Sequence, residues 1–328
     1  MSAPIRWGLM ATGGIARTFA QDLRSLPDCE IVAVGSRSRS SADAFAPDLS
    51  IARRHGSYAD LVADPDVDVV YVSPPHPVHR DATLLAIEHG KAVLCEKPFA
   101  MDRRESQQMV DAARSASVFL MEAMWTRFLP HVARLRQILA AGTLGDLVYL
   151  TAEHGQWFPQ DASHRLFAPS LGGGALLDLG VYPVSFAHLV LGPPSSVTAV
   201  STPAFTGVDA TTSMILRYPS GAHAVLTTSL AAKSNNPAVI HGTEARLEID
   251  GWFYTPTSMR VVSRDERVLE SFSTPPGGRG MEFEAAEVNR CLRAGLTESP
   301  LMPLGETLDI MGVLDEIRAQ IGLDHTAL

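Results

Sequence analysis

The first 125 residues alternate short runs of apolar, mostly β-branched residues with stretches of helical periodicity. Near-continuous apolar strands are buried on both faces, and their alternation with helices is typical of parallel βαβ units. The pattern therefore predicts an α/β domain with a parallel sheet over residues 1–125. The expected strands are 6–10, 31–36, 67–72, 92–95 and 118–121, and the expected helices are about 15–26, 41–45, 79–89 and 103–116.

The pattern changes beyond residue 125. A basic amphipathic helix is predicted over 130–141, and stretches with period-two alternation follow, which indicate an antiparallel or mixed sheet with one exposed face. We expect a second, α+β domain over 126–328 with a large, mostly antiparallel open sheet. Its closing helices, about 282–294 and 306–321, can pack back on the first domain. The alternating stretches are 147–153, 196–201, 211–218, 222–230 and 245–249.

Composition limits the partners. The formal net charge of the 328 residues is −9, which argues against binding to nucleic acid or to an anionic membrane, because both attract basic surfaces. The three cysteines show neither a disulfide framework nor metal-type spacing. The N-terminus lacks the apolar core of a signal peptide, and no apolar run looks long enough to span a bilayer. We expect a cytoplasmic protein that forms a homodimer through the open face of its sheet.

Lys97 stands at the end of an apolar strand, in the run Val93-Leu94-Cys95-Glu96-Lys97-Pro98. The proline restricts the residue before it to an extended or turn conformation. The lysine is thereby fixed at the carboxyl end of a buried strand, which is the edge where open α/β sheets bind ligands. From these residues alone, an ion pair with a nearby carboxylate explains the lysine as well as a functional role does.

A glycine-rich turn follows the first strand and reads Ala11-Thr12-Gly13-Gly14-Ile15-Ala16. It is a G-x-G-x-x-A pattern with alanine in the first position. Gly13 allows the backbone to approach a pyrophosphate, and the amides of Gly14 and Ile15 can hold phosphate at a helix start. A plain tight turn is the alternative, but the strand before it and the helix after it favour a Rossmann-type dinucleotide site.

The end of the second strand predicts which dinucleotide is bound. The chain reads Ser36-Arg37-Ser38-Arg39, without the carboxylate that usually binds the ribose of NAD. Arg37 can bind a 2′-phosphate through paired hydrogen bonds and stack on adenine, which favours NADP over NAD. The alternative is that these arginines are solvated surface residues.

The segment after the third strand reads Ser73-Pro74-Pro75-His76-Pro77-Val78-His79. We expect it beside the cofactor, with Ser73 and His76 near the ribose and the nicotinamide. His76 and His79 would need a further convergent ligand to bind a metal ion, and the sequence shows none, so we expect no metal.

A second group of residues lies in the run Gly172-Gly173-Gly174-Ala175-Leu176-Leu177-Asp178-Leu179-Gly180-Val181-Tyr182. Three consecutive glycines indicate backbone crowding against a ligand or another element. Asp178 and Tyr182 are four residues apart and share one helical face. They indicate a site, although a packed tyrosine and a helix-capping aspartate fit the spacing equally well.

These residues together resemble the Gfo/Idh/MocA oxidoreductases, and most closely the branch of dimeric dihydrodiol dehydrogenase and NADP-dependent xylose dehydrogenases. The resemblance runs nearly end to end through 11–16, 93–98, 119–128, 142–147 and 172–182. It implies an NADP-dependent dehydrogenase or reductase acting on a sugar, a sugar-derived ketone or a cyclic dihydrodiol. A non-catalytic NADP-binding regulator, or a reductase of the same fold acting on an imine or tetrapyrrole, are the alternatives.

The sequence departs from the family at Ala11, where many members have glycine. Because a methyl adds little bulk, we expect this departure to be tolerated.

The resemblance implies that Lys97 and Tyr182 form the catalytic pair and that Asp178 assists. Tyr182 would exchange the proton of the substrate hydroxyl, and Lys97 would lower the tyrosine pKa from its usual value of about 10. The residues expected at the cofactor are Ala11, Gly13, Gly14, Ile15, Ser36, Arg37, Ser73, Pro74, His76, His79, Glu96 and Lys97, with NAD as the alternative cofactor. The residues expected to bind substrate are Trp125, Arg127, Phe158 and Arg165, although ordinary core packing also explains the aromatic ones.

Overall fold

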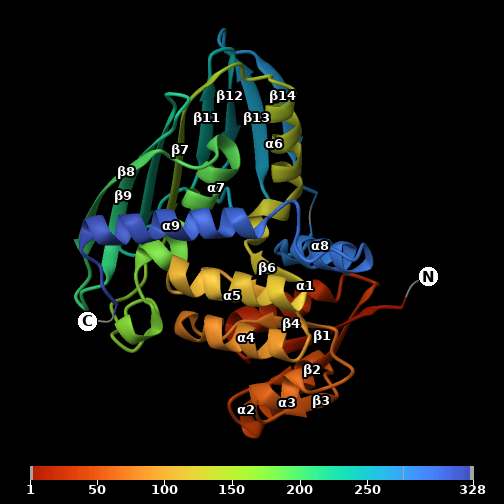
Figure 1. Ribbon diagram of the computed structural model, residues 1–328. Helices are drawn as coiled ribbons and strands as arrows, with labels where there is room; N and C mark the ends of the chain where they lie inside the picture. Colours follow the sequence, from red (N-terminus) through yellow and green to blue (C-terminus); the bar gives the residue numbers. More distant parts are fainter. Residues whose placement is uncertain (1–2, 276, 326–328) are drawn as a thin grey trace. The chain divides into compact units, whose positions relative to one another are not determined.

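The computed structural model describes residues 3–275 and 277–325 (Figure 1). These residues group into two compact units. The first unit contains the residues up to Trp125 together with Gly277–Leu308. The second contains the residues from Thr126 to those before Gly277, together with those from Asp309 onward.

The first unit is built on a six-stranded parallel sheet. Its strands are β1 (Ile5–Met10), β2 (Cys29–Gly35), β3 (Arg53–His55), β4 (Val69–Val72), β5 (Ala92–Glu96) and β6 (Leu120–Ala123). They lie in the order β3-β2-β1-β4-β5-β6, and every neighbouring pair is parallel. The strand order reverses between β1 and β4, which places the ligand crevice of such a sheet outside the carboxyl ends of these strands. The predicted α/β fold with a parallel sheet is confirmed.

The chain returns to the first unit near its end. Helix α8 (Met281–Arg293) packs against α1 (Gly14–Leu23), and the Met281 amide donates to the Asp22 carboxylate at 3.1 Å. The short strand β3 escaped prediction because all three of its residues are polar. The other helices of this unit are α2 (Arg39–Phe45), α3 (Tyr58–Val62), α4 (His79–Glu88) and α5 (Arg103–Ala116).

The second unit is built on an eight-stranded sheet. Its strands are β7 (Leu147–Gly155), β8 (Ser196–Pro203), β9 (Asp209–Arg217), β10 (His223–Ser229), β11 (Ala238–Gly242), β12 (Ala245–Ile249), β13 (Ser258–Ser263) and β14 (Val268–Ser273). Their order is β14-β13-β12-β11-β7-β10-β9-β8. Every neighbouring pair is antiparallel except β7 and β10, so the predicted mostly antiparallel sheet is confirmed.

One face of this sheet packs against helices, and the other is open. The π-helical turn η5 (Leu176–Gly180) and α7 (Val181–Leu191) pack on β7 and β10. Gln320, in the part of α9 (Leu304–Ile321) that belongs to this unit, donates to the Val197 carbonyl of β8 at 2.8 Å. On the opposite face, four neighbouring strands each carry one exposed apolar side chain, Tyr149, Val225, Ile215 and Val200, of which Val225 and Ile215 are directly paired. Helix α6 (Pro130–Ala140) completes the helices of this unit.

The expectation that no apolar run is long enough to cross a bilayer was wrong by length and composition. The segment Pro169–Leu191 passes that test, but 83 % of its most apolar window is buried inside the protein. This burial is typical of a helix in a protein core.

Candidate functional site

The glycine turn lies at the carboxyl end of β1. Helix α1 begins at Gly14, and Gly13 precedes it in an extended conformation with no side-chain cap. A Cβ built on either glycine would meet no atom within 4 Å, so protein atoms do not crowd this turn. The first amides of α1 can therefore hold an anionic group such as a phosphate.

The small bulk of Ala11 is not what decides whether alanine suits this turn; its backbone conformation is. Its φ is +98°, in the region that favours glycine. The cost of the alanine is thus conformational, and the small bulk of its methyl does not remove it. The Ala11 amide donates to the Gly35 carbonyl at 2.9 Å, which ties the end of β1 to the end of β2.

Ser36 and Ser73 lie where they were predicted, at the carboxyl ends of strands that flank β1. Both are buried, and the Ser73 hydroxyl donates to the Met10 carbonyl at 3.1 Å. The Ser36 and Thr12 hydroxyl oxygens are 3.4 Å apart. These bonds hold the glycine turn and the two neighbouring strand ends together.

Arg37 is exposed directly beyond Ser36. Two other arginines of this unit share one carboxylate: Arg39 and Arg54 both bind Asp43, at 3.1 and 3.6 Å. Within residues 3–275 and 277–325, no acidic group lies within ion-pair distance of Arg37. Burial raises the pKa of Tyr58, and the charge of Arg37 opposes this, which places the guanidinium near that phenol.

His79 connects the two loops that carry further predicted cofactor residues. Its Nε2 lies 2.9 Å from the Pro74 carbonyl and its Nδ1 lies 2.9 Å from the Pro98 carbonyl. Burial lowers the pKa of His79, and a neutral imidazole has one N–H to donate. The edge of the His76 ring packs on His79 at 5.6 Å between centroids. The loop after β4 is therefore packed directly against the loop that contains Lys97.

Glu96 and Lys97 end β5. The Glu96 carboxylate accepts a hydrogen bond from the Lys97 amide at 3.1 Å and another from the Tyr71 hydroxyl. The Tyr71 ring stacks on Phe19 of α1 with centroids 3.8 Å apart. Glu96 is buried by this packing, and Lys97 is half-buried at the carboxyl edge of the sheet.

In the second unit, Asp178 and Tyr182 lie on η5 and α7 and are 4 % and 6 % exposed. The exposed Arg165 binds both carboxylate oxygens of Asp178, at 2.8 and 3.3 Å. The structure thus pairs two residues that the sequence placed in separate roles. Such a bidentate pair fixes the plane of the carboxylate.

An aromatic cluster around Tyr182 escaped the sequence analysis. The His154 ring stacks on Tyr254 at 3.8 Å and meets Tyr182 edge-on at 5.1 Å, and Tyr182 lies 5.2 Å from Tyr254. The Gln156 side-chain amide is 2.9 Å from Nε2 of His154. The only sequence signal for this cluster was the period-two alternation of β7, which places residues 150, 152 and 154 on the inward face.

The predicted substrate-binding residues differ in exposure. Trp125 is 6 % exposed, and Phe158 is half-buried against an apolar cluster that contains Leu179. Arg127 is 1 % exposed and donates to the hydroxyl and the carbonyl of Ser185 on α7, both at 3.0 Å. Arg127 therefore also has a structural role, and the substrate contacts of Trp125, Arg127, Phe158 and Arg165 stay predictions.

Neighbouring parts of the chain crowd the run of three glycines before η5. A Cβ on Gly173 would lie 2.8 to 3.0 Å from three carbonyl oxygens of residues 165, 166 and 168. A Cβ on Gly174 would overlap Oδ1 of Asp209, and Gly174 also has a φ of +122°. The interpretation of the glycine run as a place of backbone crowding is confirmed, with another element as the neighbour.

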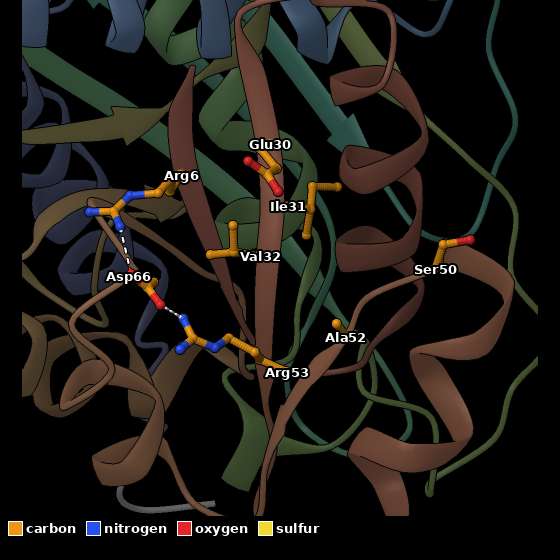
Figure 2. A pocket seen from close by; sticks show the side chains of 8 residues that line it. All are labelled: Arg6, Glu30, Ile31, Val32, Ser50, Ala52, Arg53 and Asp66. Atoms are coloured by element: carbon orange, nitrogen blue, oxygen red, sulfur yellow. Dashed lines mark hydrogen bonds and ion pairs between the residues drawn. The ribbon is translucent and has the colours of Figure 1, made fainter. Parts of the chain in front are cut away.

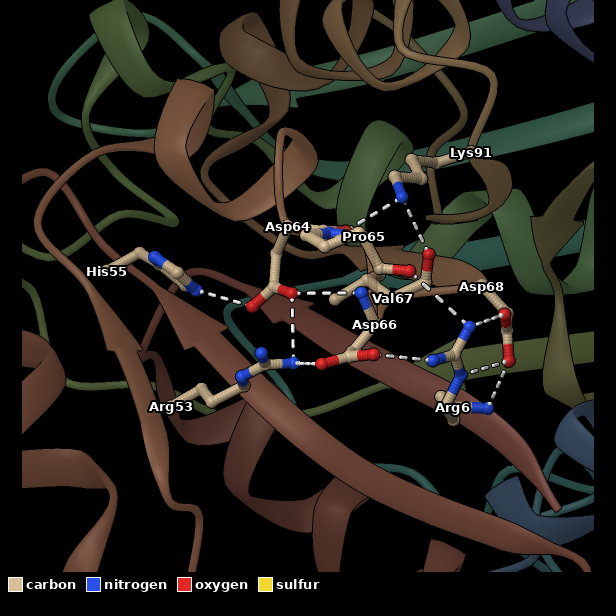
Figure 3. Close-up of polar contacts among 9 residues, drawn as sticks. All are labelled: Arg6, Arg53, His55, Asp64, Pro65, Asp66, Val67, Asp68 and Lys91. Carbon is tan, nitrogen blue, oxygen red and sulfur yellow. Dashed lines mark hydrogen bonds and ion pairs between the residues drawn. The ribbon is translucent and has the colours of Figure 1, made fainter.

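A groove of about 360 Å³ lies in the first unit, at the amino ends of its strands. Figure 2 shows Asp66 between Arg6 and Arg53 in this groove. Figure 3 shows that the same ion pairs continue into a wider network. Arg6 binds Asp68 at 2.7 Å, and Arg53 binds Asp64 at 3.1 Å. The charges of this groove neutralise one another, so we interpret it as a structural network at the sheet edge opposite the cofactor residues.

Two family models, one for each part of the chain, match it. The oxidoreductase family with an NAD-binding Rossmann fold matches residues 5–124, and the GFO/IDH/MocA C-terminal domain matches residues 132–248. The trans-1,2-dihydrobenzene-1,2-diol dehydrogenase of Bos taurus is 40 % identical over 332 residues, and that of Homo sapiens is 39 % identical over 333 residues. Each of these alignments covers 97 % of both chains.

Solved structures with the same fold include a 3-ketoreductase from Actinomadura kijaniata in complex with NADP and TDP-benzene. It is 26 % identical, has a TM-score of 0.86, and the match covers 97 % of this chain and 98 % of that chain. Levoglucosan dehydrogenase in complex with NADH and L-sorbose has a TM-score of 0.89 at 20 % identity, with 98 % and 97 % coverage. At that identity the likeness shows the fold alone.

Proposed function

Since the chain belongs to the GFO/IDH/MocA oxidoreductase family, we propose that it is a dehydrogenase or reductase of hydroxyl or carbonyl carbons. Its substrate would be a sugar, a sugar-derived ketone or a cyclic dihydrodiol. The observation that carries the proposal is the buried pair of Asp178 and Tyr182 on one helical face, in a chain that also has an uncrowded dinucleotide turn. The relatives named dihydrodiol dehydrogenases, similar over nearly their whole length, support this substrate class.

The proposed acid/base is the Tyr182 hydroxyl. In the oxidative direction it takes the proton of the substrate hydroxyl, and in the reductive direction it returns that proton to the carbonyl oxygen. The ammonium of Lys97 would stabilise the phenolate form, which lowers the pKa of Tyr182 and makes the phenolate available as a base near neutral pH. The nicotinamide, when bound, supplies or accepts the hydride.

Asp178 has a supporting role in this proposal. Its pairing with Arg165 holds its carboxylate in one orientation, from which it can accept a hydrogen bond from a substrate hydroxyl. The packing of His154 and Tyr254 on Tyr182 limits the movement of the phenol ring. A fixed acid/base within hydrogen-bond reach of the reacting proton is what such catalysis needs.

We propose NADP as the preferred cofactor. Arg37 is exposed at the end of β2, and Arg39 and Arg54 share an ion pair with Asp43, whereas Arg37 does not. Its guanidinium is thus available for a 2′-phosphate, the group that distinguishes NADP from NAD.

We also propose that the protein is a homodimer through the open face of the second sheet. Tyr149, Val225, Ile215 and Val200 expose 40 to 68 % of their surface on four neighbouring strands. A second copy would bury this apolar strip.

The test is NADPH formation by the purified protein with D-xylose, D-glucose, inositols and a trans-dihydrodiol, with NAD as the control cofactor. We expect turnover with at least one of these substrates.

Lys97→Met and Tyr182→Phe should each reduce kcat by roughly a hundredfold or more, the scale of general acid–base catalysis. Rates near wild type in both variants would refute the mechanism. Saturable NADP binding without turnover would instead support the regulatory alternative.

A further inference from the structure

The segment that carries Asp178 and Tyr182 begins at a peptide group bound on both sides by the sheet. The Leu176 amide donates to Oδ2 of Asp209 at 2.8 Å. The single proton of the Thr228 hydroxyl is shared between the Ala175 carbonyl at 3.3 Å and the His154 carbonyl at 3.2 Å. The carbonyl of residue 175 and the amide of residue 176 belong to one rigid plane. Strands β9 and β10 therefore fix both the position and the orientation of the first turn of η5.

Asp209 is built into this contact. It is the first residue of β9 and is 3 % exposed. The Thr212 hydroxyl donates to the same Oδ2 at 2.8 Å, and Thr212 is completely buried. Burial raises the pKa of Asp209 to about 7, although the bonds from Thr212 and Leu176 oppose this shift. One carboxyl oxygen thus serves two donors in the protein interior.

The other oxygen explains the last glycine of the run. Oδ1 of Asp209 occupies the place where a side chain at residue 174 would begin, so that only glycine fits there. The carbonyl of the preceding Gly173 accepts a hydrogen bond from His325 at 2.7 Å. Burial of a carboxyl group has a free-energy cost. The buried carboxyl of Asp209 lies at the start of the helical segment that contains the proposed acid/base.

We propose that Asp209 is a positioning residue for the oxidoreduction, which holds the start of η5 so that Asp178 and Tyr182 keep their reactive geometry. The inference rests on the proposed function, because it assigns Asp209 to the same site. Asp178 lies two residues beyond the amide that Asp209 binds, and Tyr182 lies six residues beyond it. A rigid helical turn transmits the position of Leu176 to both side chains.

Two substitutions distinguish the role of the carboxyl oxygen as a hydrogen-bond acceptor from the role of the negative charge. Asp209→Asn keeps an oxygen that can accept from Leu176 and Thr212, whereas Asp209→Ala removes it. We expect Asp209→Ala to lower kcat on the order of 10- to 100-fold, the effect of a small misplacement of reacting groups. The KM for NADP should stay unchanged, and Asp209→Asn should restore most of the kcat. Thr212→Val, which removes one donor, should give a smaller loss and keeps the test open if Asp209→Ala does not fold.

Hydrogen exchange gives a readout that does not depend on turnover. We expect the amides of residues 174–182 to exchange faster in Asp209→Ala than in wild type, and Asp209→Asn to resemble wild type. The matched control is Glu298, whose Oε2 accepts the Leu304 amide at the start of α9 at 2.7 Å. Glu298→Ala and Glu298→Gln change a helix-capping carboxyl outside the site and should leave kcat and this exchange unchanged.

The outcomes distinguish this inference from the proposed function. If Asp209→Ala leaves both kcat and the exchange of residues 174–182 at wild-type values, Asp209 is not a positioning residue. If the wild type turns over none of the substrates, the proposed function fails, and the exchange data alone decide. Faster exchange confined to Asp209→Ala then supports the anchoring by Asp209, and equal exchange in all variants overturns it.

Discussion

Ala11 carries a conformational cost that its small side chain does not avoid. A positive φ at a non-glycine residue costs roughly 1 to 3 kcal/mol and persists where the surrounding structure imposes it. Here the Ala11 amide is bonded to the Gly35 carbonyl, and the chain must turn at once to begin α1. The strain lies at the turn proposed to hold the cofactor pyrophosphate. Strained backbone often marks functional sites for this reason.

Arg37 offers the sharpest test of cofactor preference at the residue scale. Arg37→Glu replaces a guanidinium by a carboxylate, which would repel a 2′-phosphate and could bind a ribose hydroxyl. We expect the KM for NADP to rise about tenfold to a hundredfold, the scale of losing a charge-assisted hydrogen bond, and the KM for NAD to change far less. Steady-state kinetics with both cofactors measure the difference.

Arg39 provides the matched control for this substitution. It lies two residues further along the chain and is paired with Asp43. Arg39→Glu makes the same change of charge at a guanidinium that already pairs with a carboxylate, so we expect a smaller rise in the KM for NADP. Equal effects of Arg37→Glu on the two cofactors would contradict the NADP assignment.

At the scale of elements, helix α8 buries a carboxyl that weakens the fold at high pH. Glu284 is completely buried, and neither of its oxygens has a hydrogen-bond partner among residues 3–275 and 277–325. Burial raises its pKa well above 4.5, and the nearby charges of Glu96, Asp22 and Glu122 raise it further. The folded protein therefore keeps a proton that the unfolded chain releases, and stability falls as the pH rises above about 4.5.

Replacing this carboxyl by an apolar side chain of similar length should stabilise the protein. We expect Glu284→Met to raise Tm slightly at pH 5 and more at pH 8, because the penalty it removes grows with pH. Thermal unfolding at several pH values measures this trend. A gain in Tm that is the same at pH 5 and pH 8 would contradict the assigned cause.

Glu287, three residues further along α8, is the control. Its carboxylate binds Arg290 at 2.7 Å and accepts a hydrogen bond from Ser299. Although burial opposes it, the bond to Arg290 holds the pKa of Glu287 below its ordinary value. Its stabilising effect is therefore fully present above about pH 4.5 and is lost only as the pH falls through the lowered pKa. Glu287→Met should lower Tm at both pH 5 and pH 8.

The sequence patterns predicted elements well where burial was periodic. The parallel strands other than β3 were found because each is an apolar run. The bounds predicted for α5 match the structure to the residue, and the structure shows Asp102 as its N-terminal cap. Strands β11, β13 and β14 were not identified, although the mostly antiparallel sheet was. Of the three, β14 is an edge strand that is exposed or half-buried along its length.

The site was predictable only where its residues are neighbours in sequence. The glycine turn, Lys97 and the pair Asp178 and Tyr182 each belong to a short motif. His154 and Asp209 reach the same helical segment from strands 28 and 27 residues away from Tyr182, so no local period connects them to it. Long-range packing of this kind becomes visible only in the folded chain.

At the scale of the whole molecule, the open sheet face gives a test of assembly. Ile215 and Val225 are directly paired across β9 and β10 and are 43 % and 44 % exposed. We expect Ile215→Glu with Val225→Glu to convert a dimer into a monomer, because an interface would have to bury two unpaired carboxylates. Sedimentation at micromolar concentration measures the change in mass.

Leu296→Glu serves as the control for this pair, since Leu296 is 39 % exposed and belongs to the first unit, so it is not part of the eight-stranded sheet. It should leave the sedimentation unchanged. A wild-type protein that sediments as a monomer would remove the proposal of a dimer.

The return of α8 to the first unit has a consequence for the order in which the chain matures. The ribosome releases residues 1–125 long before residues 277–308, yet both parts belong to one compact unit. During synthesis, the dinucleotide-binding half must therefore wait with the surface of α1 uncovered while the whole of the intervening strand-rich segment emerges. Residues 277–308, which are made late, complete the domain that is made first, so a chain that ended before α8 would lack part of its first unit.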